Sequence, residues 1–168
     1  MRFSSRLRGA ALFWIAAAAA AAAGAEPRCY WPEVQSHVRQ AIAIYGPMSI
    51  DNEFFGFIYQ QGDRIDSGVV RSSSCQLGNC VVDVAVAAQR IPTGARVLGE
   101  WHTHPRNGSR LLSSLDVRGA YRNRNLACYA AYFSRPDGEI LAWNPRENSV
   151  RTAMASLVRV GSYSARSG

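Results

Sequence analysis

Lysine is absent from this 168-residue chain, in which all 19 basic residues are arginine. Because arginine and lysine serve a solvated surface about equally well, we interpret this absence as a coding bias. Charged residues are also scarce, at 18% against 48% hydrophobic residues, so the chain can bury a sizeable core and is not wholly disordered. No dense basic run is present, which argues against a nucleic-acid partner. The length favours one domain, and the sequence has no internal repeat.

Long apolar runs are lacking as well, except for one alanine-rich run at residues 10–23. A basic start precedes this run and the small residues Ala23-Gly24-Ala25 end it, as in a secretory signal peptide. The run is shorter than the roughly 20 residues that a bilayer requires, which disfavours the alternative of an uncleaved transmembrane anchor. We therefore predict a signal peptide at residues 1–25 and a periplasmic or secreted protein without a membrane anchor. Loss of the three leader arginines lowers the formal charge from +7 to +4.

Four cysteines follow the leader, and an even number in an exported chain favours disulfides. Cys75 and Cys80 bracket a short loop with turn residues, which favours this pair among the three possible arrangements. Cys29 would then tie the N-terminus to a strand at Cys128. A zinc knuckle is the alternative, but no pair has the two-residue spacing that such sites prefer. A catalytic cysteine is disfavoured because oxidised thiols leave no nucleophile.

Hydrophobic periodicity and turn residues predict a single mixed α/β domain at residues 26–168, with a core at about 31–160 and a mixed sheet flanked by helices. Gly62 supplies the turn of a hairpin between the first two strands. Residues 81–88 fit either a strand or a short helix. Helices are expected at residues 32–45 and 113–122, and strands at residues 53–59, 64–70, 96–102, 127–133, 139–143 and 150–160.

The most informative stretch is a histidine pair in the sequence VLGEWHTHP, residues 97–105, followed by SSLD at residues 113–116. Two histidines one residue apart on a strand share a face, with Cβ atoms roughly 6.5–7 Å apart. The imidazoles of His102 and His104 can then converge on one ion, with zinc–nitrogen bonds of about 2.0–2.1 Å. Asp116 on the next helix would complete three ligands and leave a fourth position open for water, as in catalytic zinc sites.

With a glutamate upstream, this pattern resembles the JAMM (MPN-plus) metalloprotease family. That family's signature is a glutamate on an early strand, then His-x-His-Pro, then serine and aspartate separated by two residues. The sequence EFFGFIY at residues 53–59 is similar to the family's early strand, in which the glutamate precedes a glycine by three residues. The resemblance covers roughly residues 53–143 and implies a JAB/MPN-type fold, closest to JAB-like domains of bacterial exported proteins and polymorphic toxins. One departure is that eleven residues separate His104 from Asp116, where the family pattern usually has ten.

Carried over residue by residue, the resemblance makes His102, His104 and Asp116 the ligands of Zn²⁺. Glu53 would be the general base that takes a proton from the zinc-bound water. Ser113 would donate a hydrogen bond to the oxyanion that forms on the substrate carbonyl.

Several of these residues have alternative interpretations. Glu100 is a second candidate for the base, because strand alternation places it on the same face as His102. Ser113 and Asp116 also fit a helix capping box. A Ser–His–Asp nucleophilic triad is disfavoured because no glycine-flanked serine elbow is present. His37 lies at the border of an apolar helix face and is expected to be structural.

We therefore expect an exported zinc-dependent peptidase or isopeptidase that acts on a peptide or protein substrate. The alternatives are a JAB-fold protein-binding module and a toxin or effector domain. All five expected site residues are present, which favours catalysis over a module that has lost its ligands. Ubiquitin specificity is not carried over, because ubiquitin-directed members of the family need a cytosolic partner that a bacterial envelope lacks.

Overall fold

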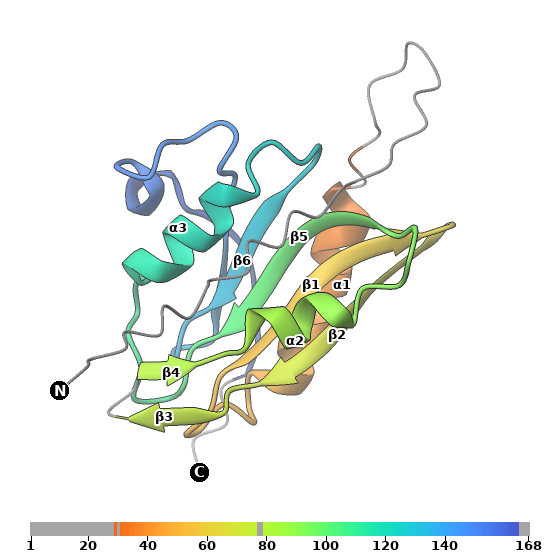
Figure 1. Cartoon of the computed structure of the whole chain (residues 1–168). Helices are drawn as coiled ribbons and strands as arrows, with labels where there is room; N and C mark the ends of the chain where they lie inside the picture. Colours follow the sequence, from red (N-terminus) through yellow and green to blue (C-terminus); the bar gives the residue numbers. More distant parts are fainter. Residues whose placement is uncertain (1–28, 30, 77–78, 165–168) are drawn as a thin grey trace, which may run out of the picture.

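The computed structural model describes residues 29, 31–76 and 79–164 (Figure 1). The predicted signal peptide at residues 1–25 lies outside the described residues. The elements in chain order are α1 (Trp31–Tyr45), β1 (Phe54–Gln61), β2 (Arg64–Arg71), β3 (Ser74–Gln76), β4 (Asn79–Val81), α2 (Val84–Gln89), β5 (Arg96–Thr103), α3 (Ser114–Arg122), β6 (Ala130–Ser134), β7 (Glu139–Trp143), the 3₁₀ helix η1 (Ala153–Ser156) and β8 (Val158–Ser162).

A six-stranded sheet in the order β2-β1-β5-β6-β7-β8 forms the centre of the fold. Strands β5 and β6 run parallel, and α3 makes the crossover between them. The other neighbouring strands of this sheet pair antiparallel. The prediction of a mixed α/β domain with a mixed sheet is therefore confirmed.

Helices cover both faces of the sheet, with α1 behind it and α2 and α3 in front of it (Figure 1). The face toward α1 packs Ile58, Leu98 and Trp101 against Val38 and Ile42 of that helix. On the opposite face, one cluster joins Phe55 and Phe57 to Ala87 of α2, and another joins Phe133 to Val117 of α3. Consecutive residues of β1 alternate between these faces because side chains of a strand alternate, whereas Leu98 and Trp101 of β5 share a face across an irregularity in its pairing with β1.

Local sequence accounts for most element boundaries. Gly62 has φ of +60° in the turn between β1 and β2, a conformation that glycine adopts at little cost. Asp83 caps α2 by accepting hydrogen bonds from two backbone N–H groups, which explains why residues 84–89 form a short helix rather than a strand. Within β5, a Cβ on Gly99 would lie 2.2 Å from the carbonyl oxygen of Ala130, so only glycine allows the close approach of β6.

Two predicted strands needed correction. The strand expected at residues 127–133 begins only at Ala130, because Cys128 has φ of +65° and lies in a turn before β6. Cys29 is therefore tied to a turn and not to a strand. The strand expected at residues 150–160 is divided, since η1 occupies Ala153–Ser156 and β8 begins at Val158. The strands β3 and β4, which form a separate two-stranded ribbon, were not predicted from the sequence.

Both predicted disulfides are present. Cys29 is joined to Cys128 across 99 residues, and Cys75 is joined to Cys80 across the ribbon. No helix in the described part of the chain is long and apolar enough to cross a bilayer.

Candidate metal centre

The structure brings together the three predicted metal ligands at the C-terminal end of β5. The imidazole Nε2 atoms of His102 and His104 are 3.1 Å apart, and a carboxylate oxygen of Asp116 completes a group of donor atoms within 4.8 Å of one another. Two ligands that share one tetrahedral zinc ion at about 2.0–2.1 Å are about 3.3–3.4 Å apart. The two nitrogens therefore already lie close to ligand spacing.

Both histidines are in surroundings that keep the imidazole neutral, the form in which it can bind a metal ion. The Nδ1 atom of His104 contacts the carbonyl oxygen of Ser109, which can only accept, so the ring proton resides on Nδ1 and the lone pair on Nε2 faces the site. The ring of His102 stacks on Phe133, with centroids 5.8 Å apart. Burial lowers the pKa of His102 to about 4 and also lowers the pKa of His104, so both rings are neutral near pH 7.

Asp116 occupies the first turn of α3 in a capping box. Its carboxylate accepts the backbone N–H of Ser113 at 2.7 Å, while the Ser113 hydroxyl oxygen accepts the backbone N–H groups of Leu115 and Asp116. Burial acts to raise the pKa of Asp116, but His102 and the hydrogen bonds from Ser113 outweigh it and lower this pKa. Asp116 can therefore be both a helix-capping residue and a metal ligand, because the capping box holds its ionised carboxylate close to the two histidines.

Glu53 lies one residue before β1, which pairs with β5, the ligand strand that carries His102. Phe55 pairs with His102 across β1 and β5, so Glu53, two residues earlier, shares the sheet face of both histidines. Burial and the negative charge of Asp116 raise the pKa of Glu53 to about 8. Glu53 is close enough to interact with Asp116 but does not belong to the group of donor atoms within 4.8 Å of one another.

Glu100, the second candidate for the base, is more deeply enclosed. Its side chain is 6% exposed and accepts a hydrogen bond from the hydroxyl of Tyr129, whose oxygen accepts the amide of Asn123 at 3.0 Å. Burial raises the pKa of Glu100 to about 7, against the lowering effect of the Tyr129 hydrogen bond. Tyr129 and Asn123 thus anchor Glu100 inside the domain, which disfavours a role that requires contact with substrate.

A buried hydroxyl pair behind the site supports the ligand strand and was not predicted from the sequence. Thr103, between the two histidines and on the opposite face, has its Oγ1 atom 2.5 Å from the Oγ of Ser49. The Thr103 hydroxyl accepts the backbone N–H of Phe54 at 3.0 Å, and the Ser49 hydroxyl donates to the carbonyl of Tyr45 at 2.9 Å. This chain of hydrogen bonds fixes the end of β5 relative to the start of β1 and the end of α1.

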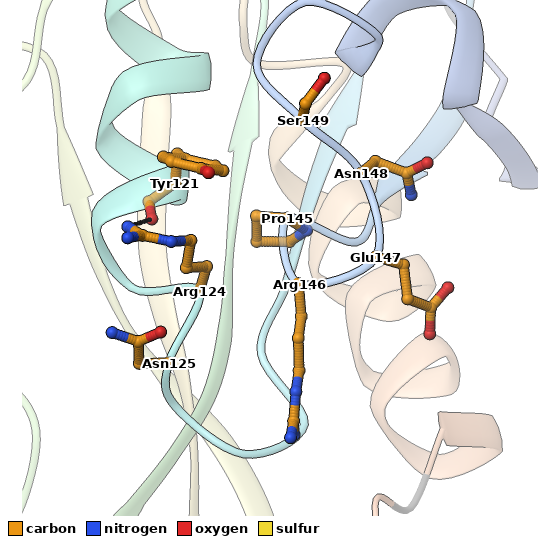
Figure 2. Close-up of a pocket in the computed structure, with 8 residues that line it drawn as sticks. All are labelled: Tyr121, Arg124, Asn125, Pro145, Arg146, Glu147, Asn148 and Ser149. Atoms are coloured by element: carbon orange, nitrogen blue, oxygen red, sulfur yellow. Dashed lines mark hydrogen bonds between the residues drawn. The ribbon is translucent and has the colours of Figure 1, made fainter.

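A separate cavity lies away from this centre. It has a volume of about 350 Å³ and lies between the C-terminal end of α3 and the connection that follows β7, where it is lined by Tyr121, Arg124, Asn125, Pro145, Arg146, Glu147, Asn148 and Ser149. Figure 2 shows the guanidinium of Arg124 turned toward the backbone of Tyr121, whose carbonyl oxygen it contacts at 3.0 Å. Glu147 and Asn148 point away from α3. The polar groups of this cavity therefore do not converge on one point, in contrast to the donor atoms of the metal centre.

Comparison of the sequence with protein-family models gives no match, and comparison with curated proteins gives none either. The JAMM resemblance therefore stays a prediction that rests on the motif. The geometry supports a coarser statement, namely that His102, His104 and Asp116 could hold a metal ion. Two imidazole nitrogens and a carboxylate oxygen are a donor set that suits zinc and several other divalent metals.

Proposed function

We propose that this chain is an exported zinc-dependent peptidase or isopeptidase of JAMM type, built on a JAB/MPN-type domain. The observation that carries this proposal is the convergence of two neutral imidazoles and an ionised carboxylate, with Glu53 on the same face beside them. Two disulfides support an oxidising compartment, as the predicted signal peptide requires.

The donor set fits a catalytic zinc ion better than a structural one. Structural zinc sites usually have four protein ligands, whereas catalytic sites have three and an open position. His102, His104 and Asp116 would be the three ligands in this protein. Zinc bound there would lower the pKa of a coordinated water and polarise the substrate carbonyl.

Glu53 and Ser113 would supply the remaining chemistry. Glu53 takes a proton from the attacking water and delivers it to the leaving amine. A metal cation nearby would lower the raised pKa of Glu53 by charge attraction, so that its carboxylate is ionised at neutral pH. The Ser113 oxygen accepts two backbone N–H groups, and its hydroxyl proton, which hydrogen-bonds the Asp116 carboxylate in this structure, would turn to the oxyanion when substrate is bound.

Exposed apolar side chains near Ser113 support a peptide substrate. Leu111 is 52% exposed and Leu115 is 74% exposed, and they lie on either side of Ser113 in the sequence. Apolar groups that are left in contact with water beside a hydrolytic centre can pack against the side chains of a bound peptide. A toxin or effector would use the same residues on a different target.

Metal analysis of the mature protein tests the centre on which the proposal depends. We expect about one zinc per chain, and loss of that zinc in His102→Ala and His104→Ala, because two remaining ligands do not retain a labile ion. His37→Ala is the matched control, since His37 is part-buried on α1 and bonds to Ser67 rather than to the cluster. Full zinc occupancy in the His102→Ala/His104→Ala double variant would contradict the site.

A screen against peptide and isopeptide libraries then tests hydrolysis. We expect cleavage that a chelator abolishes and that added zinc restores. Zinc binding without cleavage of any peptide or isopeptide would instead support the JAB-fold binding module, in which the same residues have only a structural role.

A further inference from the structure

The segment after β2 contacts the backbone of Glu53 at two points. Ser72 donates its backbone N–H to the carbonyl oxygen of Glu53 at 2.8 Å. Its side-chain oxygen accepts the backbone N–H of Glu53 at 3.1 Å. Ser72 is itself 8% exposed, so water competes poorly for either bond. A single residue therefore satisfies both backbone polar groups of Glu53.

The disulfide-closed ribbon in turn fixes Ser72. The Oγ atom of Ser72 lies 3.2 Å from Sγ of Cys75, and a disulfide sulfur can only accept, so the Ser72 hydroxyl donates to it. Ser73 then donates its backbone N–H to the carbonyl of Val81 at 3.0 Å, where the pairing of β3 with β4 begins. Each ribbon strand has only three residues, and such a short isolated hairpin is marginal in water without a cross-link.

We propose that Ser72 is a positioning residue for Glu53, and that the Cys75–Cys80 ribbon holds Ser72 in place. The catalytic consequence rests on the proposed function, in which Glu53 moves the proton. Ser72 touches neither the cluster of metal ligands nor, in this proposal, the substrate. Its loss therefore displaces the base and leaves the metal bound. Displacement of a catalytic group by about 1 Å can cost about 100-fold in rate.

The test compares Ser72→Ala with Ser73→Ala in the mature protein. Ser73 is the next residue and is exposed, and its hydroxyl contacts the carbonyl of Val81 at 3.3 Å without touching Glu53. We expect Ser72→Ala to accelerate hydrogen exchange of the Glu53 amide about 10-fold, as loss of one hydrogen bond would. We also expect kcat for peptide hydrolysis to fall about 10- to 100-fold, with KM and zinc content unchanged. Ser73→Ala should match the wild-type protein in Glu53 amide exchange, kcat, KM and zinc content.

A Cys75→Ser/Cys80→Ser variant tests the second part of the proposal. It should also accelerate exchange of the Glu53 amide, whereas a Cys29→Ser/Cys128→Ser variant should affect this amide no more than the amides of the neighbouring strand β1. Equal Glu53 exchange rates in Ser72→Ala and Ser73→Ala would overturn the assignment of Ser72. A wild-type protein without hydrolytic activity would refute the proposed function, and the amide measurements would still decide whether Ser72 and the ribbon hold Glu53.

Discussion

The two glutamates near the metal-ligand cluster, half-buried Glu53 and buried Glu100, have different surroundings. Glu100 accepts a hydrogen bond from the Tyr129 hydroxyl, within a chain that extends to Asn123 inside the domain. Glu53 has its backbone fixed by Ser72, and no hydrogen bond to its carboxylate is found among the described residues. The carboxylate of Glu53 is therefore the more available of the two for proton transfer.

Conservative substitution of each glutamate separates their roles. Glu53→Gln should keep the fold and the zinc, because glutamine is nearly isosteric and Glu53 is not one of the three ligands. Hydrolysis should fall by at least about 100-fold, the lower end of what general acid–base catalysis contributes. Glu100→Gln should cost much less in kcat/KM, since Glu100 is assigned no proton transfer. Loss of activity in Glu100→Gln but not in Glu53→Gln would reverse the assignment of the base.

At the scale of elements, α1 is joined to the sheet by a polar contact as well as by its apolar face. The Nε2 atom of His37 lies 2.9 Å from the hydroxyl of Ser67 on β2, and that hydroxyl also accepts the indole N–H of Trp101 at 3.0 Å. This network supports the prediction that His37 is structural. The neutral imidazole fits this network, because the Ser67 oxygen accepts the Trp101 N–H and keeps its own proton to donate to Nε2.

The burial of His37 predicts a pH dependence of stability. Burial lowers the pKa of His37 in the folded state, against the opposing charge of Asp66. The unfolded chain therefore gains a proton first as the pH falls through about 6.5, and the free energy of unfolding decreases until the folded pKa is passed. His37→Gln should lose less stability than the wild-type protein between about pH 7 and pH 5. Urea unfolding of the metal-free proteins at several pH values measures this, and identical pH dependence would contradict the assignment.

At the scale of the whole molecule, two disulfides close loops of very different length. The Cys29–Cys128 bridge spans 99 residues and ties the segment before α1 to the turn before β6. The Cys75–Cys80 bridge spans five residues within the ribbon. The loss of chain entropy in the unfolded state grows with loop length, so the long bridge should dominate global stability.

Paired removal of the cysteines measures that difference. On the chain-entropy estimate, Cys29→Ser/Cys128→Ser should lower the free energy of unfolding by about 4–5 kcal/mol, and Cys75→Ser/Cys80→Ser by about 2 kcal/mol. Denaturant unfolding of both double variants gives the two values. A larger loss from the five-residue bridge would show that the ribbon contributes more to the global fold than its loop length implies.

The sequence by itself determined the elements whose signals are local. The apolar periodicity of α1, the turn at Gly62 and the Ser113–Asp116 cap depend on residues a few positions apart, and each was predictable. The spacing of His102 and His104 likewise follows from strand geometry. The Cys75–Cys80 pair was predictable because its loop is short.

Only the tertiary structure decided the contacts between distant segments. Nothing in the sequence near Glu53 indicates Ser72, and nothing near Glu100 indicates Tyr129, because these pairs form only when the sheet and its crossover assemble. The start of β6 also depended on tertiary structure. Cys128, which is joined to Cys29 by a disulfide, has a left-handed backbone conformation that a non-glycine residue rarely adopts, and the strand begins only after it. Local propensity acts over a few residues, whereas the position of each glutamate depends on contacts 19 and 29 residues away along the chain.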